Sequence, residues 1–255
     1  MAALDIDIGN TRLKWRLPSH AGVVLRLGLT DEQVVDELIS QLSGLSFACV
    51  RVASVAAPEL SSLLASRFKT GFGIDPGFAV VSSEAAGVTC GYEDVSRLGV
   101  DRWLAVLAAR ARGYDNALIV DCGSAVTVDC LEGGEHRGGY IVPGLRLMVE
   151  ALYRDTSRVK VTCAEIDSLL PGRNTEEAVN RGAMQMVLGL IEKLFLEMIG
   201  RNEAGDSPVV LLTGGDASDV ARDLSAVEGV GGQVVLVLDL VMEGLACSKL
   251  ISLAK

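Results

Sequence analysis

The chain contains two similar stretches, Leu4-Asp5-Ile6-Asp7-Ile8-Gly9-Asn10-Thr11 and Leu118-Ile119-Val120-Asp121-Cys122-Gly123-Ser124-Ala125. In each, an apolar run typical of a buried strand ends in Asp-x-Gly, and a small polar residue and a second apolar run follow. One such element could arise by chance. Two of them, at the starts of two segments that each mix strand and helix patterns, predict a duplicated α/β fold with two lobes and a cleft between them.

The lobes are expected to span residues 1–115 and 116–255, each with a mixed sheet flanked by helices. Strand patterns in the first lobe occur at residues 3–8, 13–17, 22–27, 47–54 and 78–81, with helix patterns at 31–42, 58–68 and 101–112. Strand patterns in the second occur at 117–121, 126–131, 138–142, 208–212 and 234–238. Its helix patterns occur at 144–154, 175–199 and 241–253, with a further helix after residue 216.

Composition limits the possible partners and location. The 255 residues are 49% hydrophobic, enough for a substantial core, and the formal net charge is -10. This balance disfavours nonspecific nucleic-acid binding and anionic membrane surfaces. The N-terminus lacks the basic and long apolar regions of a signal peptide, and no apolar run is long enough to span a bilayer. The protein is expected to be cytoplasmic, with its six cysteines reduced and mostly buried.

The first stretch carries the groups that a nucleotide phosphate requires. Asp7 is at the carboxyl end of a strand, where α/β folds collect ligands, and it could hold Mg²⁺ through water. Gly9 permits close backbone approach, Asn10 and Thr11 offer short donors, and Lys14 adds a cation. An ordinary hairpin with an aspartate at its edge is an equally good interpretation of this stretch alone.

The second lobe offers a counterpart. Asp121, Gly123 and Ser124 repeat the pattern, while Gly214 and Gly215 follow another strand and precede a helix, where small residues permit close approach by a nucleotide. Tight structural turns are the alternative interpretation for both. No G-x-x-x-x-G-K-[ST] string exists and no G-x-G-x-x-G follows the first strand, so P-loop and dinucleotide-binding folds are disfavoured.

The most distinctive string is Gly99-Val100-Asp101-Arg102-Trp103, which enters a predicted helix. A kinase that acts on an alcohol needs a carboxylate to orient the hydroxyl and accept its proton, and Asp101 suits this role. Arg102 could clamp a substrate carboxylate. The alternative is that Asp101 caps the helix and Arg102 is solvated.

Together the strings DIGNTRLKW, GYEDVSRLGVDRW, DCGSAVTVD, GGYIVPG and LTGGDA resemble a type III pantothenate kinase over nearly the whole chain. That family has a duplicated ribonuclease-H-like or actin-like fold and belongs to the actin/sugar-kinase/heat-shock-chaperone superfamily. The resemblance implies ATP-dependent phosphorylation of pantothenate to 4′-phosphopantothenate, the first step of coenzyme A biosynthesis.

The resemblance also implies residue roles. Asp101 would be the general base, and pantothenate would contact Tyr92, Gly99, Val100, Asp101, Arg102 and Thr175. ATP would contact Asp7, Gly9, Asn10, Thr11, Lys14, Gly123, Ser124, Gly214 and Gly215. Mg²⁺ would bind Asp7 through water, and Asp121 would bind a monovalent cation, K⁺ or NH₄⁺.

Thr175 would reach substrate across the interface of a homodimer, although Asn174-Thr175-Glu176-Glu177 also reads as a helix start with capping chemistry. The apolar stripe of the 175–199 helix fits either a dimer interface or ordinary core. Ser124 stands where the family more often has threonine, and serine keeps the hydroxyl.

Two other functions are compatible with these patterns. A kinase of the same fold could act on another substrate such as an N-acetylhexosamine, although G-x-D-R-W argues against it. A noncatalytic or transcription-accessory protein would be expected to have lost Asp7, Asp101 or Asp121, and all three are present.

Overall fold

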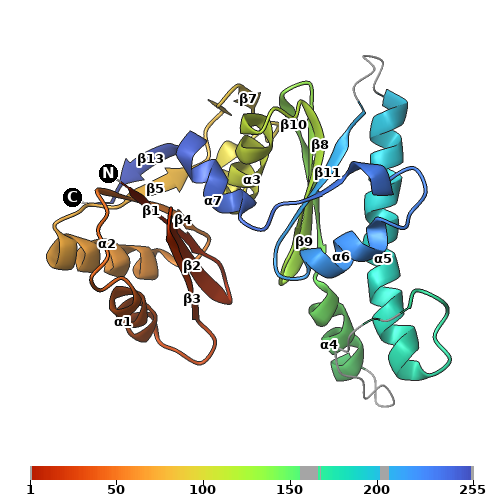
Figure 1. Cartoon of the computed structure of the whole chain (residues 1–255), viewed down its shortest axis with the longest axis horizontal. Coiled ribbons are helices and arrows are strands. Elements are labelled where there is room, and N and C mark those ends of the chain that lie inside the picture. Colours follow the sequence, from red (N-terminus) through yellow and green to blue (C-terminus); the bar gives the residue numbers. More distant parts are fainter. Residues whose placement is uncertain (1, 156–165, 167, 202–206, 254–255) are drawn as a thin grey trace. The chain divides into compact units, whose positions relative to one another are not determined.

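The computed structural model describes residues 2–155, 166, 168–201 and 207–253. The chain forms two compact units, residues 1–111 with 240–255 and residues 112–239 (Figure 1). The boundary near residue 111 is close to the expected one, but the last sixteen residues belong to the first unit and not to the second.

The first unit is built on a six-stranded sheet with the order β13-β5-β4-β1-β2-β3. In that order the strands are Lys249–Ser252, Gly77–Val80, Cys49–Ser54, Ala3–Ile8, Arg12–Leu17 and His20–Leu25. Strands β1, β2 and β3 form an antiparallel meander, and β4 and β5 follow on the other side of β1, parallel to it. A short hairpin of β6 (Glu84–Ala85) and β7 (Val88–Thr89) comes later in the unit, before the 3₁₀ turn Val95–Arg97.

The second unit repeats this order. Its strands run β12-β11-β8-β9-β10, with bounds Val234–Leu236, Val209–Thr213, Asn116–Cys122, Ala125–Glu132 and Glu135–Pro143. Strands β8, β9 and β10 form an antiparallel meander, and β11 and β12 run parallel to β8 on its other side. Both sheets therefore contain the order third, second, first, fourth, fifth, which confirms the duplicated actin-like fold.

One face of the first sheet is covered by α1 (Asp31–Gln41) and α2 (Pro58–Phe72). Leu4, Ile6 and Ile8 of β1 are fully buried in a core that includes apolar residues of both helices. Because strand side chains alternate, the acidic residues of β1 point to the opposite face. There Asp5 is almost fully buried and accepts from the guanidinium groups of Arg51 at 2.7 Å and Arg16 at 3.4 Å.

The other helices of this unit are α3 (Val100–Ala111) and α7 (Leu240–Gly244), which pack on each other and contact β4 and β1. Their contact requires glycine, because a Cβ at Gly244 would lie 2.0 Å from the carbonyl oxygen of Leu104.

The predicted C-terminal helix over residues 241–253 is wrong in its second half. After the 3₁₀ turn Leu245–Cys247 the chain becomes β13, which pairs antiparallel with β5. The free edge of β5 offers hydrogen-bonding partners to residues 249–252. This long-range pairing prevails over the local helical pattern.

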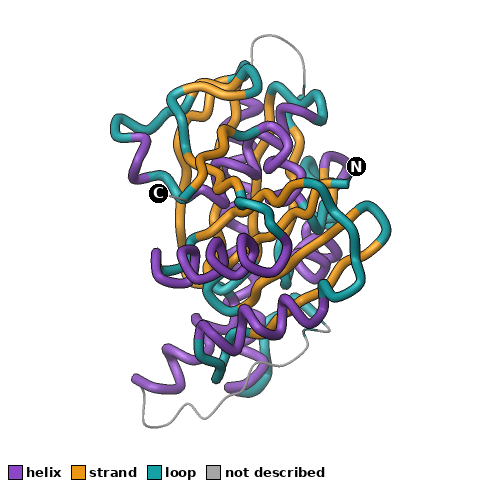
Figure 2. Tube along the Cα trace, turned by 90° about the vertical axis from the view of Figure 1, so that its left-hand side faces the viewer, coloured by secondary structure: helices purple, strands orange, loops and turns teal. Residues whose placement is uncertain are grey.

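The core of the second unit lies between its sheet and two helices, α5 (Thr175–Arg201) and α6 (Ala217–Leu224). Figure 1 draws both on the same side of β8 and β11, and Figure 2 shows the helices in purple against the orange strands. Helix α4 (Leu145–Asp155) packs against α5 through Val149 and Ala183. None of the helices in the described ranges is both long and apolar enough to cross a membrane.

The cysteines are less uniformly buried than expected. Cys122 and Cys130 are buried, Cys90 and Cys247 are partly exposed, and Cys49 is exposed; all five carry free thiols. Cys163 lies outside the described residues. Cys49 opens β4, and alternation along the strand places its side chain away from the core.

Candidate active site

The first turn of the first unit joins β1 to β2. It is closed by a hydrogen bond from the Gly9 amide to the Arg12 carbonyl at 2.9 Å, and a Cβ at Gly9 would lie only 3.3 Å from that oxygen. Asp7 and Lys14 are directly opposite in the β1–β2 register, and both are half-buried. Cross-strand partners have neighbouring side chains, so a carboxylate and an ammonium flank the turn. Asn10 is exposed at its tip, and Thr11 is half-buried.

The second group lies at the start of α3. The half-buried Asp101 accepts through Oδ1 from the Arg102 amide at 2.8 Å, which fixes the carboxylate at the helix N-terminus. The Trp103 amide donates to the Gly99 carbonyl at 3.0 Å. A Cβ at Gly99 would lie 2.6 Å from Asp101 Oδ1, so a side chain there would displace the carboxylate. Val100 is half-buried beside them.

Arg102 is held by the protein, which contradicts the alternative that Arg102 is solvated and only Asp101 has a structural role. The residue is only 6% exposed. Its Nη1 donates to the Tyr92 hydroxyl at 2.8 Å, and its guanidinium carbon lies 5.7 Å from the centroid of the Tyr92 ring. A cation fixed by a tyrosine is a preorganised donor for a carboxylate ligand.

The third group gathers three sequence motifs of the second unit around the β8–β9 turn. The Gly123 amide closes the turn on the Ala125 carbonyl at 3.0 Å, and the exposed Ser124 is at its tip. The Gly144 amide donates to the Ser124 carbonyl at 3.1 Å, and a Cβ at Gly144 would lie 2.3 Å from the Gly123 carbonyl. The GGYIVPG string therefore ends directly against the DCGSA string.

The LTGGDA string meets the same turn from β11. Gly214 has φ +99°, and a Cβ there would lie 2.4 Å from Asp121 Oδ1 and 2.5 Å from the Cys122 carbonyl. The Asp216 amide donates to that carbonyl at 2.9 Å. Gly215 is exposed between them. Only glycine at Gly214 allows Asp121 to lie against this turn.

Asp216 is a residue whose importance the sequence did not reveal. It immediately precedes α6, a position where an acid commonly caps a helix, yet its side chain makes no capping hydrogen bond. Burial first, then the carboxylates of Asp121 and Asp216, raise the pKa of the Cys122 thiol far above its usual range. Two acidic groups therefore create a negative potential at this turn, which would attract a cation.

Thr175, the remaining predicted site residue, is exposed at the first position of α5. The capping role belongs to Asn174, whose side chain accepts from the Glu177 amide at 2.9 Å and donates to the Glu177 carboxylate at 2.8 Å. The Thr175 hydroxyl is not needed for capping. Within the described part of the chain it makes no hydrogen bond to the motifs above.

The repeated sheet order and the two Asp-x-Gly turns define the class, a protein of the actin-like fold. A solved structure from Campylobacter jejuni, described as a conserved Baf family transcriptional activator, matches with a TM-score of 0.58 at 18% identity, covering 95% of both chains. A Sinorhizobium meliloti protein described as a 2-dehydro-3-deoxygalactonokinase matches with a TM-score of 0.54 at 12% identity, covering 96% of this chain and 97% of the other. At these identities the likeness shows the fold alone.

The family is shown by sequence. Residues 3–197 match the family profile of the type III pantothenate kinases. The type III pantothenate kinase of Chromohalobacter salexigens is 42% identical over 231 residues, which cover 87% of this chain and 80% of that protein. The chain belongs to the type III pantothenate kinase family, as its motifs predicted. It is a kinase that phosphorylates pantothenate in coenzyme A biosynthesis.

The thiol of Cys122, inside the candidate site, is expected to resist alkylation. Burial, with added repulsion from Asp121 and Asp216, disfavours its thiolate, and burial is also the main cause that raises the pKa of Cys130 to about 11. Since the thiolate is the nucleophile, brief treatment of the native protein with iodoacetamide at pH 8 should label the exposed Cys49 and spare the other two.

Peptide mass spectrometry measures the labelling, and the urea-unfolded protein, in which every cysteine should react, is the control. Labelling of Cys122 in the native protein as fast as that of Cys49 would contradict the burial and charge described for this turn.

Proposed function

We propose that Asp101 is the general base that orients the pantothenate hydroxyl and accepts its proton as the hydroxyl attacks the γ-phosphate of ATP. The observation that carries this assignment is the fixed carboxylate beside a bare glycine. Asp101 is anchored by the Arg102 amide, and it is only half-buried, so its carboxylate is fixed without being enclosed. A base must come within hydrogen-bonding reach of the proton it removes, and a fixed, partly exposed carboxylate permits that approach.

The pantothenate carboxylate is assigned to Arg102. A buried guanidinium held by Tyr92 presents a planar donor set that matches a carboxylate. Gly99 and Val100 would line the pocket beside Asp101, and the Tyr92 ring would keep the cation in place. Binding at both ends of the substrate would hold its hydroxyl near the base, as proximity catalysis requires.

ATP is assigned to the two Asp-x-Gly turns. In the first unit, backbone and side-chain donors of Gly9, Asn10 and Thr11, with Lys14, would contact the phosphates. In the second, Gly123 and Ser124 would contact the phosphates and Gly214 and Gly215 the nucleoside. The Gly9 and Gly123 amides close their turns, so the support is the bare backbone at each turn together with the exposed Asn10 and Ser124 at the two tips. Because the chain carries a net charge of -10, these local donors must supply the attraction.

The carboxylates suit hard cations. Asp7 is assigned to Mg²⁺ through water, and Asp121 to a monovalent cation, K⁺ or NH₄⁺. In the described ranges no three His, Cys, Asp or Glu side chains gather to hold a metal ion, so neither site is a closed protein cage. The oxygen donors present fit cations that are completed by water and ATP. Such cations would neutralise the charge of the phosphates during transfer. We place this reaction in the cytoplasm, where free thiols persist.

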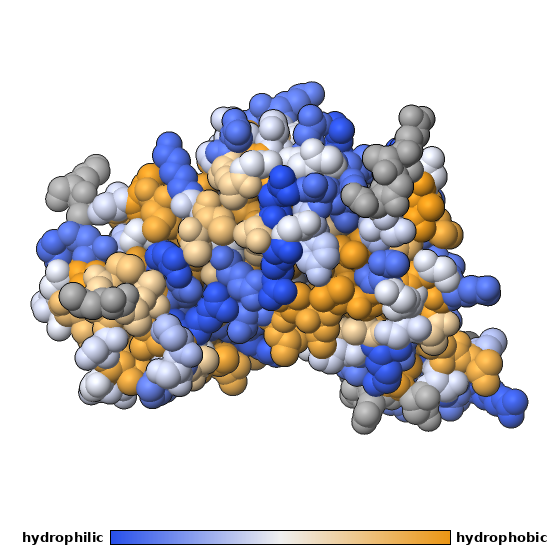
Figure 3. Space-filling view, turned by 45° about the horizontal axis from the view of Figure 1, so that its top comes forward, coloured by the Kyte–Doolittle hydropathy of each residue, from blue (hydrophilic) through white to orange (hydrophobic). Residues whose placement is uncertain are grey.

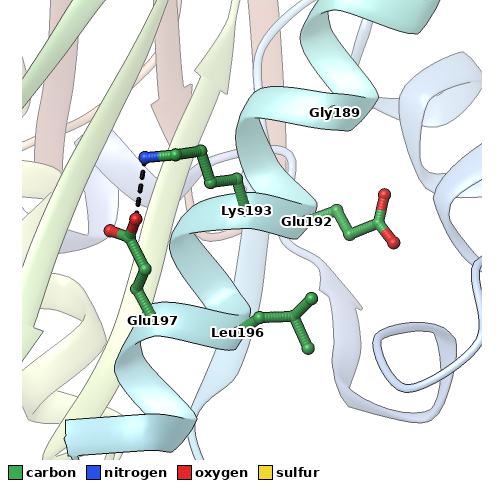
Figure 4. A pocket seen from close by; sticks show the side chains of 5 residues that line it. All are labelled: Gly189, Glu192, Lys193, Leu196 and Glu197. Carbon is green, nitrogen blue, oxygen red and sulfur yellow. Dashed lines mark hydrogen bonds and ion pairs between the residues drawn. The ribbon is translucent and has the colours of Figure 1, made fainter.

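A homodimer is proposed through α5. Nine residues of this helix are buried, so its apolar stripe does serve as core, but Met186, Leu196 and Ile199 remain exposed on it. Figure 3 shows that hydrophobic residues reach the surface in several places, so exposure alone does not mark an interface. The proposal follows the resemblance to the family, which places Thr175 at the start of this helix. A shallow hollow of about 520 Å³ also lies along the helix (Figure 4), lined by Gly189, Glu192, Lys193, Leu196 and Glu197. In this arrangement Thr175 would contact the substrate bound to the partner copy.

Replacing Asp101 with Asn should lower kcat by about 10²- to 10⁴-fold, the usual contribution of a general base, while both KM values change little. A coupled assay with ATP, Mg²⁺ and pantothenate measures this. Asp75→Asn, which removes an exposed carboxylate of the same unit that pairs with Lys69, is the matched control and should keep parental turnover. Parental turnover in the Asp101→Asn variant would contradict the assignment of Asp101 as the general base.

Turnover should depend on potassium, and the dependence should require Asp121. We expect the parent to be several-fold more active in KCl than in NaCl at equal ionic strength, and Asp121→Asn to show the same low rate in both salts. Asp219→Asn, which changes an exposed carboxylate of the same unit, should keep the potassium response. An unchanged potassium response in Asp121→Asn would place the cation elsewhere.

A charge among the exposed apolar residues of α5 should disrupt the dimer. Leu196→Glu is expected to shift the mass measured by light scattering after gel filtration from dimer to monomer, because burying an unpaired carboxylate is strongly unfavourable. Leu27→Glu changes an even more exposed leucine, 87% against 49%, in the first unit and should leave the dimer intact. A parent that is monomeric at micromolar concentration would refute the proposal.

A further inference from the structure

An arginine that no motif singles out lies against the first Asp-x-Gly turn. Arg26 directly follows β3, and its Nη1 donates to the Gly9 carbonyl. Its backbone amide donates to the Thr11 carbonyl at 3.0 Å. One residue therefore binds both ends of the three-residue turn that we assign to the ATP phosphates.

Strand register explains how a residue fifteen positions beyond Thr11 in the chain reaches the turn. In the β2–β3 pairing Arg12 lies opposite Leu25, so Arg26, the residue after β3, is level with the turn itself. The side chain of Arg26 then extends past the end of β2 to the last residue before Asn10. This placement requires the meander and cannot be read from local sequence.

The charge on Arg26 is only partly compensated. Its Nη2 lies 3.8 Å from the carboxylate of Asp31, a long ion pair whose acidic partner is 44% exposed. Its Nε is buried and makes no hydrogen bond with any described residue. Because a guanidinium stays protonated, a positive charge persists beside the turn. A nucleotide phosphate that reached this turn would meet a cation in addition to Lys14.

We infer that Arg26 is a positioning residue for ATP. By binding the Gly9 carbonyl, Arg26 sets the conformation of the turn that we assign to the phosphates. A carbonyl oxygen that faces an arriving phosphate repels it, and a carbonyl held by a guanidinium has its negative potential offset. The inference rests on the proposed assignment of ATP to this turn. It adds a residue that acts through the turn, without itself touching the reacting atoms.

The test compares Arg26→Ala and Arg26→Lys with the parent. Arg26→Ala should weaken Mg·ATP binding and raise the KM for ATP by about tenfold, equivalent to about 1.4 kcal/mol, with the KM for pantothenate within twofold of the parent. Arg26→Lys keeps the charge and should recover part of the loss. Isothermal calorimetry with Mg·AMPPNP, a nonhydrolysable ATP analogue, measures binding independently of turnover.

Two controls separate this role from a purely structural one. Arg67→Ala breaks an exposed ion pair with Asp36, 3.1 Å long and in the same unit, and should leave the KM for ATP unchanged. Asp31→Asn removes the competing carboxylate and should leave nucleotide binding equal to or tighter than that of the parent. Weakening by Asp31→Asn equal to that by Arg26→Ala would mean that the ion pair, not the turn, matters, and would overturn the inference.

A folded Arg26→Ala variant, with a cooperative thermal transition and parental affinity for Mg·AMPPNP, would also overturn it. If Arg26→Ala does not fold, Arg26→Lys and Arg26→Gln are compared with the parent instead. The inference is then overturned if both variants keep the parental affinity for Mg·AMPPNP and the parental KM for ATP. A parent that binds the nucleotide yet does not phosphorylate pantothenate would refute the proposed function while leaving the test of Arg26 intact.

Discussion

Both units depend on one constraint: a carboxylate, at the start of a helix in the first unit and at the end of a central strand in the second, must lie beside backbone that carries no side chain. At Gly214 an added Cβ would come within 2.4 Å of Asp121 Oδ1, and at Gly99 within 2.6 Å of Asp101 Oδ1. Real Cβ atoms do not approach oxygen so closely, so a larger residue would move the carboxylate or open the turn. The glycines fix the acids in place, and these are the acids to which we assign the chemistry.

Burial distinguishes the acids that we assign to ligands from one that is structural. Asp5 is almost fully buried and is neutralised by Arg16 and Arg51, so it holds the sheet together. Asp7, two residues later on the same strand, is only half-buried and lies beside the turn that closes the hairpin. An aspartate is thus structural at one position of this strand and assigned to a ligand at another, and the difference is its burial.

The sequence was sufficient for features that depend on local pattern. Alternation along the strands and the glycine turns predicted most strands of both sheets, and the repeated Asp-x-Gly string predicted the duplication. What could not be predicted depends on distant pairing. The strand at Lys249–Ser252 exists because the edge of β5 accepts it, and Arg26 reaches Gly9 only through the β2–β3 register. Asp216 was missed because an acid before a helix ordinarily reads as a cap.

The chain's path also has a consequence for biosynthesis. The second unit is continuous, whereas the first needs residues 240–255 to supply α7 and its sixth strand. Domains on a growing chain usually complete in order from the N-terminus. Here the unit that emerges second can close first, while the unit that emerged first keeps the edge of β5 unpaired until Lys249–Ser252 has been made. A stop codon or proteolytic cut within residues 240–252 would therefore damage the unit that contains the N-terminal strands, far from the lesion in the sequence.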